Sequence, residues 1–597
     1  MILYALLALM PACTQLHPNP GREAGEDTTA TAALMEVEPI RFADVTRTEL
    51  NADDQTGLSF TWSEGDKTGV YSSGDGYALF RITDGEGTGS AHFDGGGFGL
   101  TGDSTYYAFY PYGAEWTDKT SLPLRFSGQR FLTDDDRTSP MAYDYLWSEA
   151  TAREGKARFH FSHIGAFFRL RLTLPPGMAV SGIEWVPLTE ELPTEGTFDL
   201  TSGTYSPTHT QVRMRLSAGE SLTVPDNGIL TVWTVMPPRD YSDDAFAVFV
   251  YSGSEPVLSA RIEGRDFTSG KAFRHAVGPF ALDETSTHGF IVSDKGQKAV
   301  PVTSGQYSGI AWISGDRYAV VDDRLKGGGI TFFTIPINLT NGSVGTVSME
   351  KAAGTASSTL SSKDAEGVAW DGSHLFVSFE KDQSIREYNL DGTPTGRSMS
   401  IPADMAKARL SSSGGGFESL SYNAMTGRFW TTTEMPLIKD SFIPRMHRIQ
   451  CFDGDLKPAG RYLYRMDSPT RATVESGATY VFGIPAITAL DDGRLIVLER
   501  EVHVPPYKSL WDLLPVMDQI FTRMKLFVVD PATDEAGILR KSLLASFSTS
   551  YANLANYEGM CLGPTLADGS RCLVLIPDSQ GGMNGLTSEY VRVITFR

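Results

Sequence analysis

Acidic residues recur in pairs along the second half of the chain, and their spacing could bring carboxylates together. A segment opens with an acidic residue or Ser beside Gly and closes on another acidic residue, 14 positions later from Glu366 to Glu380 and 20 positions later from Glu558 to Asp578. The copies span Tyr307 to Asp323, Ala365 to Glu380, Phe417 to Glu434, Phe482 to Glu499 and Tyr557 to Asp578. Gathered carboxylates repel one another unless hard metal ions or Arg and Lys side chains lie among them.

Metal-dependent hydrolysis of a phosphoester is the chemistry that such a group would support. One or two calcium ions would orient phosphate oxygens and acidify a bound water. The predicted metal ligands are Asp322, Asp323, Glu366, Glu418, Glu558 and Asp578. The predicted catalytic residues are Glu380, Glu434 and Glu499, with Arg324 and Arg500 to clamp the phosphate. The alternative is a structural or binding ring, in which these acids pair with Arg side chains, Arg386 and Arg448 included, and with loop amides.

Each copy has the pattern of an antiparallel hairpin: a short apolar run, a turn bearing Gly, and a second run rich in β-branched and aromatic residues. The two ends of a hairpin lie together, so we expect Glu366 beside Glu380, Glu418 beside Glu434 and Glu558 near Asp578. Copies begin 52 positions apart (365 to 417) to 75 positions apart (482 to 557), which fits radial blades with added loops. The sequence therefore predicts a β-propeller over residues 288–597.

Six blades would fit this length, with the sixth joining the C-terminal strand (589–597) to strands from the start of the domain. The segment from Pro505 to Met524 breaks the strand pattern with a short helical stretch. It follows Glu499 and Arg500 directly, so we expect a lid or rim over the mouth where the carboxylates gather.

Composition limits the class of protein. The chain of 597 residues is too long for a single core, and its 60 Gly and 32 Pro with few helical patterns indicate an all-β protein. A formal charge of −21 argues against nucleic acid or anionic lipid as the main partner.

The N-terminus predicts export. Met1 to Ala12 is apolar but too short to span a bilayer, and Cys13 follows a small residue. Residues 1–13 resemble a bacterial lipoprotein signal, which implies lipidation of Cys13 and an anchor in the outer membrane at the cell surface. A plain secretory signal with an incidental Cys is the alternative. Residues 14–39 read as a flexible tether.

The remaining cysteines leave two interpretations open. Cys561 and Cys572 flank the turn LADGS and could form a disulfide across a hairpin in an oxidising compartment. Alternatively, both are small buried hydrophobic residues.

The first half contains four distinctive motifs: RTEL (Arg47 to Leu50), FTWSEGDKTGVY (Phe60 to Tyr71), YYAFYPYG (Tyr106 to Gly113) and FHFSHIGAFFRLRLTL (Phe159 to Leu174). In this order they resemble the fimbrillin family of Bacteroidales surface lipoproteins. It implies two β-sandwich domains, 40–152 and 153–284, divided where strand patterning lapses into EATAREGK. It also implies an adhesive or pilus-associated role, with a fimbrial or surface protein as partner.

The repeats of the second half contain the motifs SGI with VVDDR (308–310, 320–324), EGVAW with FVSFE (366–370, 376–380), GFESL with TTTE (416–420, 431–434), VLER (497–500) and NYEG with IPD (556–559, 576–578). In this order they resemble the esterase-like phytase domain family. The resemblance implies a small phosphorylated or ester substrate. No GxSxG nucleophile motif, P-loop or GxGxxG after a strand is present.

Taken together, the sequence predicts two β-sandwiches followed by a six-bladed propeller in a surface lipoprotein that hydrolyses a phosphoester or related ester. A non-catalytic adhesin that binds a ligand at the propeller mouth is the main alternative. A purely structural surface protein is the other.

Overall fold

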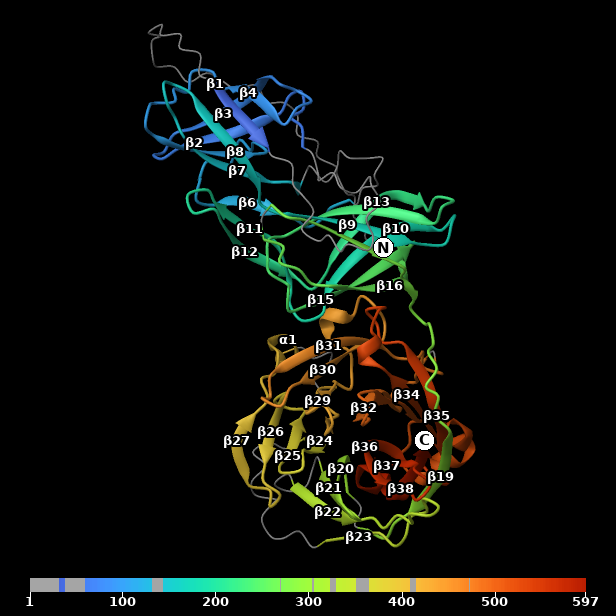
Figure 1. Ribbon diagram of the computed structural model, residues 1–597. Helices are drawn as coiled ribbons and strands as arrows, with labels where there is room; N and C mark the ends of the chain where they lie inside the picture. Colours follow the sequence, from blue (N-terminus) through green and yellow to red (C-terminus); the bar gives the residue numbers. More distant parts are fainter. Residues whose placement is uncertain are drawn as a thin grey trace. The chain divides into compact units, whose positions relative to one another are not determined.

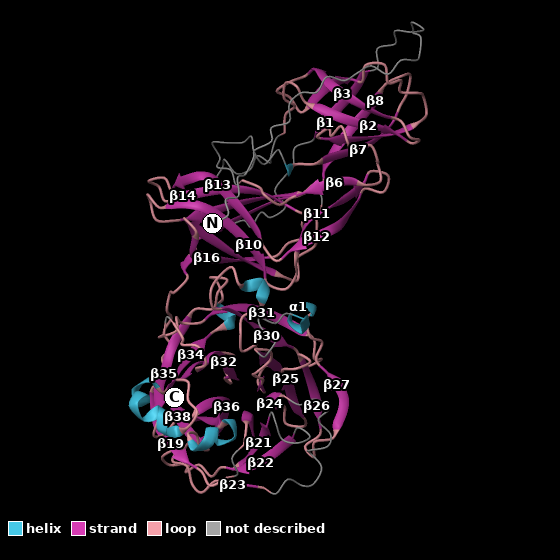
Figure 2. Cartoon of the chain, turned by 180° about the vertical axis from the view of Figure 1, so that it is seen from behind, coloured by secondary structure: helices cyan, strands magenta, loops and turns pink. Residues whose placement is uncertain are grey.

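The chain is seen in a computed structural model that describes residues 32–37, 60–130, 143–268, 270–302, 305–322, 329–350, 364–407, 415–471 and 473–597. Strands dominate these ranges and helices are few and short (Figure 2), so the predicted all-β class is confirmed. The predicted signal peptide with Cys13, most of the predicted tether, Asp323 and Arg324 lie outside the described residues.

A closed barrel of seven strands forms the first compact unit, whose described residues are 32–37, 60–117 and 147–161. The strands follow the order β1–β4–β3–β2–β5–β7–β8. Their bounds are β1 (Ala32–Val37), β2 (Lys67–Ser72), β3 (Tyr77–Asp84), β4 (Ser90–Asp94), β5 (Thr105–Tyr110), β7 (Leu146–Thr151) and β8 (Ala157–His163).

The barrel differs from the predicted sandwich because β1 closes the sheet. β1 pairs antiparallel with β4 and parallel with β8. Its alternating Ala33 and Met35 are fully buried, so a segment that the sequence placed in the tether belongs to the core. The predicted boundary at 152/153 falls inside the β7–β8 hairpin, whose turn is closed by the bridge between Arg153 and Lys156.

The second compact unit, which contains the described residues from 118 to 146 and from 162 to 597, begins with a β-sandwich. Its sheets are β13–β10–β15–β16–β18, β14–β9–β17 and β12–β11–β6. The first two share a core in which Phe168 and Phe246 pack against Trp185. The bounds are β6 (Leu122–Arg125), β9 (Ala166–Thr173), β10 (Ala179–Pro187), β11 (Leu192–Asp199), β12 (Thr204–Gln211), β13 (Met214–Thr223), β14 (Ile229–Met236), β15 (Ala245–Ser252), β16 (Glu255–Glu263), β17 (Ala272–Val277) and β18 (Phe280–Ala281).

Five four-stranded sheets follow in the same unit. Sheet 1 contains β20 (Tyr307–Ser314), β21 (Arg317–Asp322), β22 (Gly329–Thr334) and β23 (Ser348–Met349). Sheet 2 contains β24 (Ala365–Trp370), β25 (Leu375–Phe379), β26 (Ser384–Tyr388) and β27 (Pro394–Ser398). Sheet 3 contains β28 (Ser421–Asn423), β29 (Arg428–Thr431), β30 (Met446–Phe452) and β31 (Pro458–Arg465). Sheet 4 contains β32 (Thr479–Ala489), β33 (Leu495–Val504), β34 (Phe521–Val529) and β35 (Lys541–Ser550). Sheet 5 has the order β19 (Val292–Ala299), β38 (Tyr590–Phe596), β37 (Arg571–Asp578) and β36 (Asn556–Thr565).

These sheets form a ring around a central axis (Figure 1). The first strand of each repeat is innermost, and β20, β24, β28, β32 and β36 contact one another in a closed cycle. Among the described residues the ring has five sheets, and the predicted number of six is wrong. The C-terminal strand β38 and the entering strand β19 do close the ring, but they complete the sheet of the fifth repeat instead of forming a sixth.

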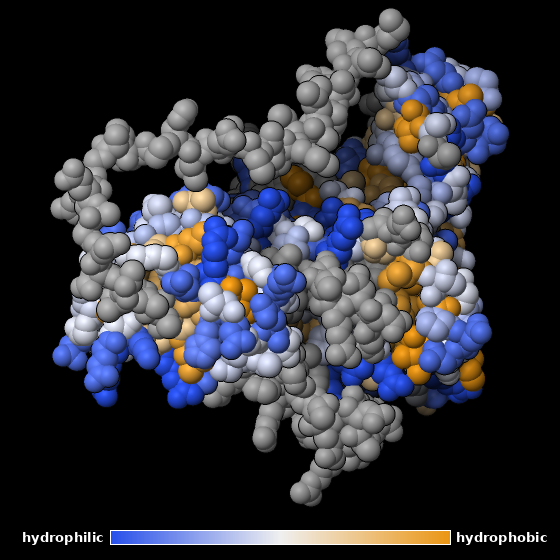
Figure 3. Space-filling view, turned by 90° about the horizontal axis from the view of Figure 1, so that it is seen from above, coloured by the Kyte–Doolittle hydropathy of each residue, from blue (hydrophilic) through white to orange (hydrophobic). Residues whose placement is uncertain are grey.

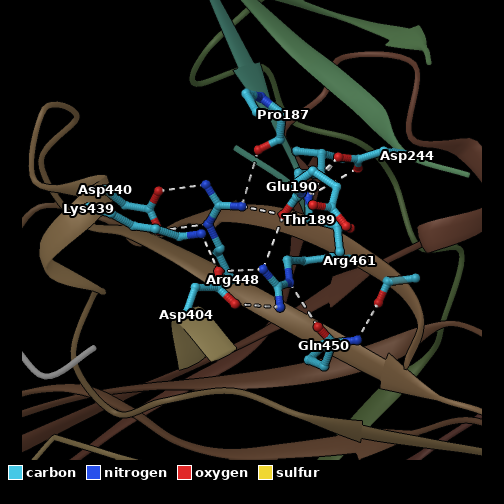
Figure 4. Close-up of polar contacts among 12 residues, drawn as sticks. Pro187, Thr189, Glu190, Asp244, Asp404, Lys439, Asp440, Arg448, Gln450 and Arg461 are labelled. Carbon is cyan, nitrogen blue, oxygen red and sulfur yellow. Dashed lines mark hydrogen bonds and ion pairs between the residues drawn. The ribbon is translucent and has the colours of Figure 1, made fainter. Parts of the chain in front are cut away.

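The sandwich docks on sheet 3 through a junction cluster of charged residues. We use this name for Asp404, Lys439, Asp440, Arg448 and Arg461, drawn in Figure 4. An apolar patch surrounds it, in which residues of β10 and β15 pack against residues of the ring. Lys439 and Asp440 come from η4 (Ile438–Asp440), and Asp404 comes from α1 (Ala403–Lys407).

The segment from Pro505 to Met524, predicted as a lid or rim, forms α2 (Leu510–Leu513) and η5 (Leu514–Gln519). Its apolar side packs against Leu554, Leu586 and Met583, which follow strands of sheets 4 and 5. Trp511 is 79% exposed on the other side.

The three described cysteines, Cys451, Cys561 and Cys572, are buried and free. The β36–β37 register places Cys561 opposite Val574, so the second interpretation, buried hydrophobic residues, is confirmed. No helix in the described ranges is long and apolar enough to cross a membrane. The face shown in Figure 3 is mostly hydrophilic, with small scattered hydrophobic patches.

Candidate functional site

The ends of the repeated hairpins meet at one mouth of the ring, as predicted. Strand register pairs Ala365 with Phe379 and Phe417 with Thr433 in antiparallel fashion, so the acidic residues that follow them lie diagonally across each hairpin, on either side of these pairs. In sheet 5, Asn556 pairs with Asp578. The hairpins of sheets 2, 3 and 5 therefore deliver one acidic residue from the incoming strand and one from the outgoing strand, whereas those of sheets 1 and 4 deliver one from the outgoing strand alone.

Glycine in the repeat has a packing role. A Cβ on Gly309 would lie 2.5 Å from the carbonyl oxygen of Glu366, and a Cβ on Gly367 would lie 2.6 Å from the backbone nitrogen of Leu420. Neither distance is tolerable for a side chain, so only Gly allows the innermost strands to approach so closely. The Ser–Gly and Glu–Gly pairs of the sequence thus draw the acidic residues toward the axis.

Arg500 lies at the centre of these acids. Its guanidinium forms ion pairs with Glu434 and Glu558 and donates to the side-chain oxygen of Asn556 at 3.1 Å. The side chain is 3% exposed. Burial alone would lower the pKa of Arg500, but Glu558, Glu434 and Glu418 outweigh it and raise the pKa, so the guanidinium is fully charged. Its Nε is buried without a hydrogen-bond partner among the described residues.

Glu418 is a carboxyl of the mouth with an unusually high pKa. Burial raises the pKa of its carboxyl well above the usual value, and the charges of Glu366, Glu434, Glu558 and Glu380 raise it further. The raised pKa favours the protonated form of this carboxyl, which can donate a proton.

Glu558 has a raised pKa as well, because burial outweighs the attraction of Arg500. It also accepts a hydrogen bond of 2.7 Å from the side-chain nitrogen of Asn556. Glu380 is held at the edge by the backbone N–H groups of Gly415 and Gly416. We call the assembly of Glu366, Glu380, Glu418, Glu434, Glu558 and Arg500 the mouth cluster.

Other predicted site residues lie outside the mouth cluster. Glu499 accepts hydrogen bonds from the Tyr464 hydroxyl and from Lys541, both at 2.6 Å, and from the backbone N–H of Asp467. Adjacent residues of a strand face opposite sides, so Glu499 points away from the side that Arg500 occupies.

Asp322 and Asp578 lie in sheets 1 and 5. Asp322 accepts from the backbone N–H of Gln306 at 3.3 Å, and Asp578 accepts from the backbone N–H of Gln580 at 2.7 Å. Asp322 adds to the raised pKa of the nearby Glu589, which is raised mainly by burial. Asp322 therefore lies near Glu589.

Two predicted arginines also lie elsewhere. Arg386 pairs with Asp382 and stacks over Phe379, while Arg448 belongs to the junction cluster. Asp323 and Arg324 lie outside the described residues.

Sequence reasoning missed Asn556, Glu589 and Lys541. A usable signal existed only for Asn556, which is two positions before Glu558 and therefore on the same face of β36. Glu589 and Lys541 belong to segments outside the repeated motifs.

Comparison with known families supports both halves of the interpretation. Residues 302–580 match the family model described as phytase-like, "Esterase-like activity of phytase". Residues 45–276 match the fimbrillin-like model. Both predicted resemblances are confirmed. The phytase-like region contains the whole mouth cluster, and the fimbrillin-like region contains most of the barrel and the sandwich.

Solved structures give weaker likenesses. A candidate cell adhesion protein from Bacteroides ovatus is 20% identical, with 42% of this chain and 92% of that chain covered and a TM-score of 0.30. The glutaminyl cyclase of Myxococcus xanthus is 12% identical, with 52% and 96% covered and a TM-score of 0.26. None of the curated proteins matches the chain.

A calcium ion does not fit the described part of the phytase-like mouth. No group of three or more His, Cys, Asp or Glu side chains in the described ranges is arranged to hold a metal ion. Arg500 instead lies between Glu434 and Glu558 and supplies positive charge there. The sequence left open whether metal ions or basic side chains lie among the carboxylates. The described residues contain the basic side chain, Arg500.

Proposed function

We propose that this chain is a hydrolase of a phosphoester or related ester and that the mouth cluster is its active site. The observation that supports this most is the buried Glu418, whose carboxyl has a pKa raised well above its usual value by burial, among other carboxyls and a buried arginine. Acid–base catalysis uses carboxyls with pKa values raised in this way. The match to the phytase-like model over 302–580 supports the reaction class.

In the proposed reaction, Glu418 and a neighbouring carboxylate divide the proton transfers. Water attacks the phosphorus or carbonyl carbon of the ester while the carboxylate, for which Glu366 is the first choice, accepts a proton from that water. The bond to the leaving oxygen breaks, and that oxygen takes the proton of Glu418. The two carboxyls then exchange roles through one proton, so one water is consumed and an acid and an alcohol are released.

Arg500 has a positioning role in this proposal. It forms ion pairs with Glu434 and Glu558 and thereby fixes these two carboxyls beside Glu418. Asp323, one of the predicted calcium ligands, lies outside the described residues. A calcium site that includes Asp323 therefore remains a proposal.

The test is turnover by the purified full chain on phosphomonoesters, phosphodiesters, inositol phosphate and carboxyl esters, each with calcium and with chelator. Glu418→Gln should reduce turnover by about a hundredfold or more, as loss of a general acid does. The matched control is Glu387→Gln, since Glu387 is also buried but pairs with Arg397 in sheet 2. No turnover on any substrate by folded protein, with and without calcium, would reject the enzyme.

A surface adhesin or ligand-binding protein is the second candidate. Its support is the fimbrillin-like match over 45–276, which accounts for more than a third of the chain. In this case the mouth would bind a surface ligand without turning it over. Binding that survives Glu418→Gln, together with absent turnover, would favour it.

Cell-surface location in the outer membrane through a lipid on Cys13 is part of both proposals, and the fimbrillin-like match supports it. Radiolabelled palmitate should enter the wild-type chain and not Cys13→Ser. Labelling of both proteins, or of neither, would contradict the anchor.

A further inference from the structure

The end of the ring opposite the mouth cluster contains a cavity. It has a volume of about 290 Å³ and is lined by residues near the far ends of the innermost strands of all five sheets. A much smaller space of about 10 Å³ lies toward Glu418 and Glu558. Ile310, Val368, Leu420 and Met560 line both spaces, so an apolar layer separates the cavity from the acids.

Aromatic side chains from three consecutive sheets line one side of this cavity. They are Trp312 of β20, Trp370 of β24 and Tyr422 of β28, each partly exposed. The indole N–H of Trp312 donates to the carbonyl of Gly315 at 2.9 Å, and the Tyr422 ring packs on Phe429 with centroids 4.6 Å apart. Trp312 and Tyr422 are thus held in place before any ligand arrives.

Charged groups complete the lining. Arg571 of sheet 5 pairs with Asp491 of sheet 4. One carboxylate oxygen of Asp371 accepts hydrogen bonds from the backbone N–H groups of Ser373 and His374, at 2.7 and 2.6 Å. The pKa of Tyr422 is raised by burial and also by the charge of Asp371. The lining therefore offers both hydrogen-bond donors and acceptors beside the aromatic side.

The chemistry of this lining selects the ligand. An organic cation would suit the aromatic rings but would face Arg571, and an anion would face Asp371 and Asp491. A neutral ring that has apolar C–H faces and hydroxyl groups at its edge satisfies both sides, because a hydroxyl donates and accepts. The volume is at the lower end of the usual range for ligand sites.

We propose that this cavity binds a pyranose sugar unit, either free or at the end of a glycan. The site is independent of hydrolysis at the mouth cluster. Backbone-to-side-chain braces keep it open: Asn423 donates to the carbonyl of Leu490 at 2.6 Å, and Ser421 accepts from the N–H of Ala489 at 2.9 Å. These braces join sheets 3 and 4 at the rim.

The test uses titration calorimetry and saturation-transfer NMR on the full chain with a panel of hexoses, N-acetylhexosamines and their methyl glycosides. At least one sugar should bind saturably, and Trp370→Ala should weaken it at least about tenfold, as expected for loss of an aromatic contact face. A methyl glycoside that binds as well as the free sugar would indicate the end of a glycan, while loss of binding on methylation would indicate the free sugar. Trp511→Ala, at an exposed Trp outside the cavity, is the matched control and should bind normally.

Asp371→Asn provides a second variant in case Trp370→Ala fails to fold, and it should weaken the same sugar severalfold. Choline serves as the cationic probe. Binding of choline without any sugar, no binding by the whole panel, or unchanged sugar affinity in folded Trp370→Ala or Asp371→Asn would each overturn the proposal.

Discussion

Two buried charge clusters in the same ring differ in their balance of positive and negative side chains. The junction cluster sets Lys439, Arg448 and Arg461 against two aspartates, and the excess positive charge is met by backbone carbonyls. Arg448 donates to the carbonyls of Pro187 and Leu188, and Arg461 also reaches Leu188 at 3.3 Å. The mouth cluster has the opposite balance, with Arg500 as the described cation among five glutamates.

The difference separates a structural role from a functional one. Burial by itself would raise the pKa of Asp404, but Arg461 and Lys439 lower it to about 2, so this carboxylate is stabilised in its charged form. At the mouth, burial and like charges raise the pKa of Glu418. The junction cluster therefore contributes stability, whereas the raised pKa of Glu418 costs stability at the site that we propose to be catalytic.

Loss of Arg448 should have the largest effect. Arg448→Met leaves Asp440 buried without its partner, because both side chains are about 1% exposed. We expect a loss of roughly 3–5 kcal/mol in the free energy of unfolding, measured by urea denaturation. A loss below about 1 kcal/mol would remove the contrast between the clusters.

Asp404→Asn tests the same cluster through pH. A folded pKa of about 2, below the usual value of 3.8 for an aspartate, means that Asp404 contributes stability above pH 3.8 that disappears as pH falls through 2. The variant should therefore be less stable by about 2 kcal/mol at neutral pH, with the gap closing toward pH 2. Denaturation curves at a series of pH values measure it, and a gap that is constant with pH would contradict the assignment.

Glu418→Gln should act in the opposite direction. A folded pKa above the unfolded value gives stability that is fully present below pH 4.5 and is lost as pH rises through the folded pKa. Gln cannot ionise, so the variant should gain about 1 kcal/mol or more at alkaline pH and nothing in acid. A thermal-shift series across pH would show it, and a variant that is destabilised at high pH would place Glu418 with the structural pairs.

Arg386→Met should have the smallest effect. Its pair with Asp382 is about one-third exposed, and such pairs contribute between 0 and about 1 kcal/mol. Turnover should be unchanged, because Arg386 lies outside the mouth cluster. A large loss of turnover would mean that the cation of the mouth is not Arg500 alone.

The ring and its acidic mouth were predictable because alternating hairpins repeat visibly in the sequence. The number of sheets was not, since β19 is polar and largely exposed and resembles a loop in the sequence. Glu499 and Arg500 were both assigned to the site, although neighbours on a strand face opposite sides. The junction cluster had no local signal, because Arg448 meets carbonyls 260 and 261 positions earlier in the chain.

The central claim is that Glu418 holds a proton near neutral pH. Infrared spectra in the carboxyl region, recorded at pH 7 for the wild-type chain and for Glu418→Gln, test it directly. The account predicts a C=O stretching band of a protonated carboxyl in the wild type that is missing from the variant. Identical spectra in that region, with both proteins folded, would contradict it.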